Sequence, residues 1–195
     1  MLNLSLINLF FIMSIIIAFI IIISLIVVYA FFVYNRMVIL KNRIKEAWSD
    51  IDVQLKRRNS LIPNLVSSVK GYMKHEKDLL SKITELRSKI EKATDKKELS
   101  SLDTQLRSAL GSLRIAVENY PDLKANQNVL KLQEELTNTE DKIAYSRRFY
   151  NQTVLTYNNM VKTFPGILYA RLFNFAPEEF FEASDEERKD IKVEL

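Results

Sequence analysis

The hydrophobic pattern of the chain starts with an uncharged stretch from Leu6 to Val33. A run of about 18 or more apolar residues without a charge is typical of a transmembrane helix. At about 1.5 Å of rise per residue this run makes roughly 42 Å of helix, which exceeds a hydrocarbon core of about 30 Å. No basic residue precedes the run and no small-residue cleavage site follows it, which disfavours a cleaved signal peptide. We therefore predict a transmembrane helix over residues 1–35.

Past this stretch the apolar side chains keep the period of a helix, with spacings of four, three and four at Ile44, Trp48, Ile51 and Leu55. No helix breaker lies between Leu2 and Arg58, so we expect the membrane helix to continue into the soluble part. In the stretch RRNSLIPNL, Asn59 or Ser60 can cap a new helix that has Pro63 in its first turn. Alternatively, Pro63 kinks one long helix, and the sequence leaves both arrangements open.

Two shorter helical patterns come next. The first runs from Leu65 to Ile90 with Gly71 inside it, for which we expect close helix packing or, alternatively, a local bend. The second follows a polar turn in which Thr94 or Asp95 can cap a helix. Pro121 should stop that helix just after Tyr120, because a residue before proline leaves the helical region.

The longest pattern predicts a helix from about Asn126 to Phe164, ended by Pro165, with a short aromatic segment after it. A helix of this length with one apolar stripe, which runs from Val129 to Phe164, needs partners along all of it. We therefore predict an all-α protein whose N-terminal transmembrane helix continues into a cytoplasmic antiparallel bundle of about four long helices. The bundle should cover residues 36–175, and residues 176–195 should form a solvated acidic tail.

Charge sets the expected orientation of the chain. Basic side chains follow the apolar run directly, and these form a membrane-proximal basic collar: Arg36, Lys41, Arg43 and Lys45. The positive-inside rule places this side in the cytoplasm and the N-terminus outside. Anionic lipid head groups should attract the collar by about 1 kcal/mol per basic residue near the surface. Nucleic-acid binding is not expected, because it needs a denser basic face with groove-reading or stacking residues.

Residue types argue against an enzyme. The chain has no cysteine and a single histidine, His75, which removes thiol chemistry and multi-histidine metal sites. It has no glycine-rich phosphate loop, nucleophile elbow or HExxH motif. His75 lies among charged neighbours and is expected to be exposed to solvent. We predict no catalytic residue, no cofactor and no metal site.

Several polar side chains occupy positions where the helices should be packed. Arg57 and Arg58 lie beside the possible bend, and the long helix carries Arg147, Arg148, Tyr150, Asn151, Tyr157 and Asn158. We favour a structural role over ligand binding, since satisfied buried polar groups specify helix register. The candidate acidic partners are Glu135, Glu140 and Asp141.

Five separated blocks resemble the LemA family of membrane proteins: AWSDIDVQLKRRNSLIPNLVSSVKGYMKHE, ENYPDLKAN, LQEELTNTEDKIAYSRRFYN, VLTYNNMVKTFPG and the closing FFEAS. The similarity keeps the same order from about Tyr34 to Val193. Two departures are Gly166-Ile167 after the Phe-Pro pair, where relatives tend to have Asn, and Asn174-Phe175, where relatives often have Gly-Phe. Because Asn tolerates the left-handed conformation, a turn at Asn174 is expected to survive.

The resemblance implies a bacterial protein with one N-terminal membrane helix, an outside N-terminus and a cytoplasmic helical bundle. It implies no enzyme activity, and some relatives are tied to membrane remodelling in magnetosome formation. The motif residues that it marks, for which we expect structural roles, are Trp48, Gln54, Arg57, Arg58, Pro63, Asn64, Gly71, Tyr120, Pro121, Arg147, Tyr150, Asn151, Tyr157, Asn158, Phe164 and Pro165.

These observations favour a single-pass protein of the bacterial inner membrane that acts as a scaffold. Its cytoplasmic bundle would self-associate as a homo-oligomer, and it would shape the membrane through anionic lipids. The alternative hypothesis is a membrane-tethered adaptor or signalling module that recruits another protein.

Overall fold

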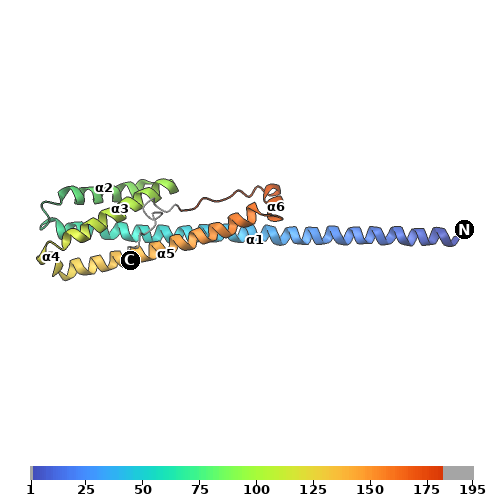
Figure 1. Cartoon of the computed structure of the whole chain (residues 1–195), viewed down its shortest axis with the longest axis horizontal. Coiled ribbons are helices and arrows are strands. Elements are labelled where there is room, and N and C mark those ends of the chain that lie inside the picture. Colours follow the sequence, from blue (N-terminus) through green and yellow to red (C-terminus); the bar gives the residue numbers. More distant parts are fainter. Residues whose placement is uncertain (1, 182–195) are drawn as a thin grey trace, which may run out of the picture. The chain divides into compact units, whose positions relative to one another are not determined.

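The computed structural model describes the backbone of residues 2–181 and the side chains of residues 9–181 (Figure 1). Within those residues the secondary structure is six helices and no strand, which confirms the all-α prediction: α1 (Leu2–Lys70), α2 (Lys77–Lys92), α3 (Lys96–Val117), α4 (Pro121–Lys124), α5 (Gln127–Lys162) and α6 (Gly166–Leu172). Most of the predicted acidic tail, residues 182–195, lies outside the described part.

The described residues divide into two compact units. The anchor unit comprises residues 2–43 and 155–178, and the bundle unit comprises residues 44–154 and 179–181. Both α1 and α5 contribute residues to each unit, because each helix passes a unit boundary along its own length.

In the anchor unit, the apolar run of α1 stays uncovered by protein. The helix contains an 18-residue window with a mean hydropathy of 3.4, none of it buried, so it is long and apolar enough to cross a membrane. Burial begins where the run ends, at Val33, Met37 and Leu40. Helix α6 and the residues after it lie against this part of α1. The ring of Tyr169 is 5.9 Å from that of Tyr29, and the rings of Phe173 and Phe175 are 5.0 and 5.7 Å from that of Tyr34.

The core of the bundle unit follows the predicted apolar stripes. Buried apolar side chains come from every long helix of the unit and include Ile51, Leu55, Leu65, Ile83, Leu106, Leu113, Val129 and Ile143. In α3, the carboxylate of Asp95 accepts hydrogen bonds from the backbone N–H groups of Lys97 and Glu98 at 3.0 and 2.9 Å. Of the two candidate caps, Asp95 is therefore the one used.

Pro63 lies inside α1, which continues to Lys70, so of the two arrangements that the sequence left open, the single long helix is the one observed. The buried side chains of Ile62 and Leu65 flank Pro63 and hold this part of the helix against the core. The predicted helix from Leu65 to Ile90 is wrong, since a turn separates α1 from α2. Gly71 lies in this turn, and an added Cβ would meet no atom within 4 Å. Close helix packing at Gly71 is therefore wrong, and the alternative of a local bend is the better description.

The longest predicted helix is confirmed within two residues at each end. The side chain of Asn126 caps α5 by accepting a hydrogen bond from the backbone N–H of Asn128 at 3.0 Å. Phe164, expected as the last buried position, is instead 80% exposed. Beyond it, a cis peptide bond joins Phe164 to Pro165, and α6 follows, a helix that the sequence analysis did not predict.

Candidate functional site

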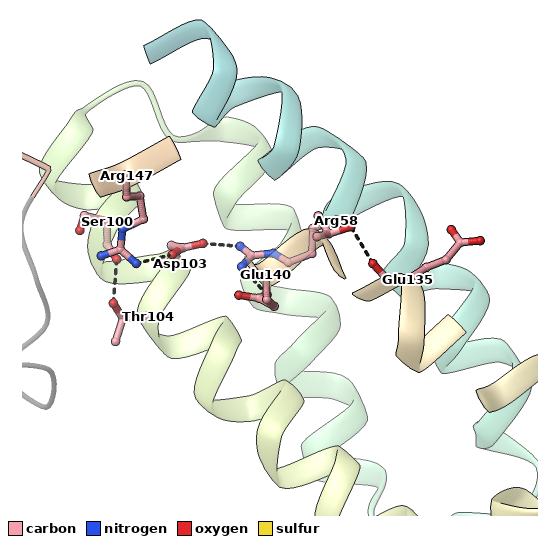
Figure 2. Close-up of polar contacts among 8 residues, drawn as sticks. Arg58, Ser100, Asp103, Thr104, Glu135, Glu140 and Arg147 are labelled. Carbon is pink, nitrogen blue, oxygen red and sulfur yellow. Dashed lines mark hydrogen bonds and ion pairs between the residues drawn. The ribbon is translucent and has the colours of Figure 1, made fainter. Parts of the chain in front are cut away.

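A buried arginine lies at the centre of the bundle unit, between three helices (Figure 2). Arg58 extends from α1, and its Nη2 donates a hydrogen bond to Asp103 Oδ1 of α3 at 2.5 Å. Its Nη1 donates to Glu140 Oε1 of α5 at 2.8 Å. Arg58 and Asp103 are fully buried, whereas the side chain of Glu140 is 24% exposed. One guanidinium therefore joins α1, α3 and α5.

A second arginine completes a cluster of two cations and two carboxylates. Arg147 Nη1 of α5 lies 3.5 Å from Asp103 Oδ2, on the opposite side of that carboxylate from Arg58 (Figure 2). Burial acts to lower the pKa of the Arg58 guanidinium, but the charges and hydrogen bonds of Asp103 and Glu140 outweigh burial and raise that pKa. Arg58 therefore keeps its proton at every physiological pH, and it cannot serve as a general acid or base.

The cluster fixes the register of the three helices. A buried charge without a partner is strongly destabilising, so each helix must present its charged residue at the level of the others. Among the predicted partners, Glu140 is confirmed, while Asp141 is exposed to solvent. Asp103 was missed by the sequence analysis. Its signal was present, because it lies four residues after Leu99 and three before Leu106, on the buried stripe of α3.

Aromatic and basic side chains form a second cluster in the bundle unit. The ring of Trp48 lies 5.6 Å from that of Tyr150 and 5.9 Å from that of Phe181. Lys96 Nζ lies 4.9 Å from the centre of the Trp48 ring, and the guanidinium carbon of Arg147 lies 4.5 Å from the centre of the Phe181 ring. Cation–π contacts of this kind contribute about 0.5–2 kcal/mol each. The cluster holds Phe181, the last described residue, against α1 and α5.

The residues after α6, here called the C-terminal segment (residues 173–181), are held by polar side chains of α5. In the bundle unit, Tyr150 donates to the carbonyl oxygen of Glu179 at 2.9 Å. The Asn151 side chain donates to the carbonyl oxygen of Phe181 at 2.9 Å and accepts from the N–H of Phe181 at 2.8 Å. Such reciprocal bonds satisfy both backbone groups of one residue.

The same pattern recurs in the anchor unit. Tyr157 donates to the carbonyl oxygen of Ala176 at 3.0 Å, and Asn158 makes the reciprocal pair with Glu178 at 2.8 and 2.9 Å. Burial raises the pKa of the Tyr157 hydroxyl, and the carboxylate of Glu178 adds to that effect. Each Tyr-Asn pair, Tyr150 with Asn151 and Tyr157 with Asn158, therefore holds the C-terminal segment through hydrogen bonds to its main chain.

The side chains of the predicted basic collar are mostly exposed to solvent. Arg36 and Arg43 of the anchor unit are exposed, as is Lys45 of the bundle unit. Lys41 is half-buried, and its Nζ lies 3.9 Å from Glu178 Oε1. Contact between the collar and anionic lipid stays a prediction.

The remaining predicted residues do not gather into one site. Arg148 was expected in the packed face of α5 but is exposed, which corrects that prediction. Other motif residues are also exposed, namely Arg57, Pro63, Asn64, Gly71, Pro121 and Phe164. Gln54 is half-buried, and Tyr120 donates a hydrogen bond to Glu76 at 2.7 Å. His75 is exposed, as predicted, and residues 9–181 contain no group of three potential metal ligands.

Comparison with known proteins identifies the family. The sequence profile of the LemA family matches residues 47–195. The chain belongs to the LemA family. It is 34% identical over 166 residues to Protein LemA of Metamycoplasma hominis, covering 83% of this chain and 76% of that protein. It is also 25% identical over 175 residues to Magnetosome protein MamQ 2 of Paramagnetospirillum magneticum, covering 76% of this chain but only 64% of that protein.

The match to the LemA family confirms the resemblance drawn from the five sequence blocks. Together with the apolar part of α1, it indicates a membrane-associated protein. In this LemA-family chain, buried and half-buried motif residues bond to carboxylates of other helices or to the main chain, as Arg58, Asn151 and Asn158 illustrate. The arrangement is suited to fixing helix positions.

Proposed function

We propose that this LemA-family protein is a non-enzymatic scaffold of the bacterial inner membrane, which self-associates and shapes the membrane from its cytoplasmic face. The observation that carries the proposal is the use of the polar residues that are buried or half-buried in the helices. Arg58 joins three helices, and Asn151 and Asn158 hold the C-terminal segment by its main chain. These bonds support a role in which the bundle presents a fixed surface.

A pair of surface aromatics supports self-association. Tyr145 is 66% exposed and Phe149 is also exposed, and their spacing of four residues places them on one face of α5. Aromatic side chains are enriched at the centres of protein interfaces and carry much of the binding energy there. A second copy of the chain, meeting the same face, would cover both rings.

Light scattering of the detergent-purified protein tests self-association. We expect a protein mass above the 22.8 kDa of one chain and a return to one chain in the double variant Tyr145→Ser, Phe149→Ser. Ile115→Ser is the matched control, since it removes an exposed apolar side chain from α3. A monomeric wild type would refute the scaffold proposal, and unchanged assembly in the double variant would refute this interface.

Labelling of single cysteines tests the orientation, because the chain has no native cysteine. In intact cells, an impermeant maleimide should label Ser5→Cys, ahead of the apolar run, and leave Ser108→Cys on α3 unlabelled until the membrane is opened. The reverse pattern would place the bundle outside. Imaging of vesicles that carry the protein tests membrane shaping, and vesicles identical in shape to protein-free ones would contradict it.

A basic groove favours the second candidate function, an adaptor that recruits an acidic segment of another protein. The groove has a volume of about 830 Å³ and lies between the end of α1 and α2. Apolar residues including Met73 and Leu80 line it together with five lysines: Lys70, Lys74, Lys77, Lys89 and Lys92. Cross-linking in cells from Ser81, on the groove wall, should then capture a foreign protein. Contacts with other copies alone would count against the adaptor.

A further inference from the structure

The segment around α6 presents apolar side chains that no part of the described chain covers. Leu168 and Leu172 of α6 are 57% and 69% exposed, and Phe164 before the helix continues the same four-residue spacing. From Phe164 to Pro177 the sequence contains one charged residue, Arg171. An exposed apolar face with so little charge is unusual for a surface in water and marks an interaction site.

Ring contacts place this segment beside a defined part of α1 in the anchor unit. The ring of Tyr169 in α6 lies 5.9 Å from that of Tyr29. The rings of Phe173 and Phe175 lie 5.0 and 5.7 Å from that of Tyr34. The residues from Tyr169 to Phe175 therefore follow α1 at the level of residues 29–34.

The same residues of α1 mark the edge of the lipid. Phe31 and Phe32 are well exposed in the structure, as are the apolar residues before them, so lipid must extend to about this level to cover them. Arg36 is the first charged residue after the run and belongs among the head groups. The boundary between acyl chains and head groups thus lies between Phe32 and Arg36. Tyrosine and arginine, as at Tyr169 and Arg171, are suited to such a boundary.

A groove next to Phe173 adds room for lipid. It has a volume of about 370 Å³, and its walls come from α1 and from Phe173 itself: Val27, Ala30, Phe31, Tyr34, Asn35 and Phe173. Apart from Asn35 and the hydroxyl of Tyr34 the lining is apolar, so an acyl chain can fill the groove while burying few polar atoms.

We propose that residues 164–173 form an interfacial anchor, which inserts its exposed apolar side chains into the boundary region of the leaflet that α1 enters from the bundle side. The inference rests on the proposed membrane crossing of α1. The ligand is the lipid surface itself, and the insertion depth is set by the Tyr29–Tyr169 contact. A short helix that occupies area in one leaflet expands that leaflet relative to the other. This difference in area bends the bilayer, which is how the anchor would contribute to the proposed shaping of the membrane.

Depth-dependent fluorescence quenching tests the anchor in the full chain. We place single cysteines at Leu168, at Leu25 within the apolar run and at Ser108 on α3, and label each with a polarity-sensitive fluorophore. The proteins are reconstituted in vesicles of phosphatidylcholine and phosphatidylglycerol that contain spin-labelled lipids. We expect quenching at residues 168 and 25 to exceed that at residue 108 by about twofold or more.

The three positions separate the possible failures. Quenching at residue 25 with residue 168 at the level of residue 108 would overturn the anchor and leave the membrane crossing intact. A lack of quenching at residue 25 would overturn both. In the 168-labelled protein, Leu172→Glu should reduce quenching by about half because a carboxylate opposes insertion, whereas Ile115→Glu on α3 should leave it unchanged. Equal quenching in both variants would overturn the anchor.

Discussion

Removal of Asp103 should destabilise the bundle more than most single substitutions. Asp103→Ala leaves the fully buried guanidinium of Arg58 with one carboxylate, that of Glu140, at 2.8 Å. Breaking a buried ion pair in this way costs about 3–5 kcal/mol. Because Glu140 remains, we expect the lower end of that range, about 3 kcal/mol. In a chain of this size each kcal/mol lost from the free energy of unfolding lowers the midpoint of thermal unfolding by roughly 2–4 °C. The expected fall in that midpoint is therefore roughly 6–12 °C.

Thermal unfolding in detergent micelles, followed by the helical circular dichroism signal, measures this loss. Arg57→Ala is the matched control, since Arg57 neighbours Arg58 on α1 but is exposed, and it should change stability by about 0.5 kcal/mol or less. The double variant Arg58→Met, Asp103→Leu should be more stable than Asp103→Ala, because it removes the buried guanidinium that would otherwise lack one of its two carboxylates. Equal midpoints for Asp103→Ala and Arg57→Ala would refute the assignment of the cluster as a register device.

Three further predictions concern α3, α5 and the C-terminal segment. Asn158→Ala should speed hydrogen exchange at the backbone amide of Glu178 by about tenfold to a hundredfold, because the pair of hydrogen bonds between residues 158 and 178 is lost. The control Asn159→Ala, at an exposed neighbouring residue, should leave that exchange rate unchanged. Burial raises the pKa of Tyr157 in the folded state. The stability that Tyr157 contributes is therefore complete below the ordinary tyrosine pKa of about 10, and it is lost as the pH rises through the raised pKa of the folded protein. The free energy of unfolding measured between about pH 8 and 11 should fall less in Tyr157→Phe than in the exposed control Tyr72→Phe. Asp95→Ala should lower the free energy of unfolding by about 1 kcal/mol through loss of the α3 cap, and an unchanged denaturation midpoint would contradict this.

Local pattern predicted the parts of the fold that depend on neighbouring residues. The apolar run, the α3 cap at one of Thr94 and Asp95, and the long helix α5 all follow from spacing and capping over a few residues. Pro63 is a different case, because an interior proline costs about 3 kcal/mol and tertiary packing decides whether the helix survives it. The buried side chains of Ile62 and Leu65 supply that packing, and they act through other helices.

The candidate site was predictable in kind but not in its partners. The sequence marked Arg58 as a polar residue with a structural role and Glu140 as one of its candidate partners, but it could not join Arg58 to Asp103, which lies 45 residues away. Helix α6 escaped prediction since seven residues carry too little periodic signal. Phe164 was assigned to the core by its place in the stripe of α5, yet the described protein offers it no partner surface.

The grip of α5 on the C-terminal segment has a consequence for sequence divergence. Asn158 and Asn151 recognise only the N–H and carbonyl groups of residues 178 and 181. Any residue other than proline offers both groups. Pro177 has no N–H, but none of these bonds uses an N–H at residue 177. Substitutions along residues 176–180 can therefore accumulate without loosening the segment, whereas an insertion or deletion of one residue would misalign it. Among related chains, the number of residues in this stretch should therefore be conserved more strictly than their identities.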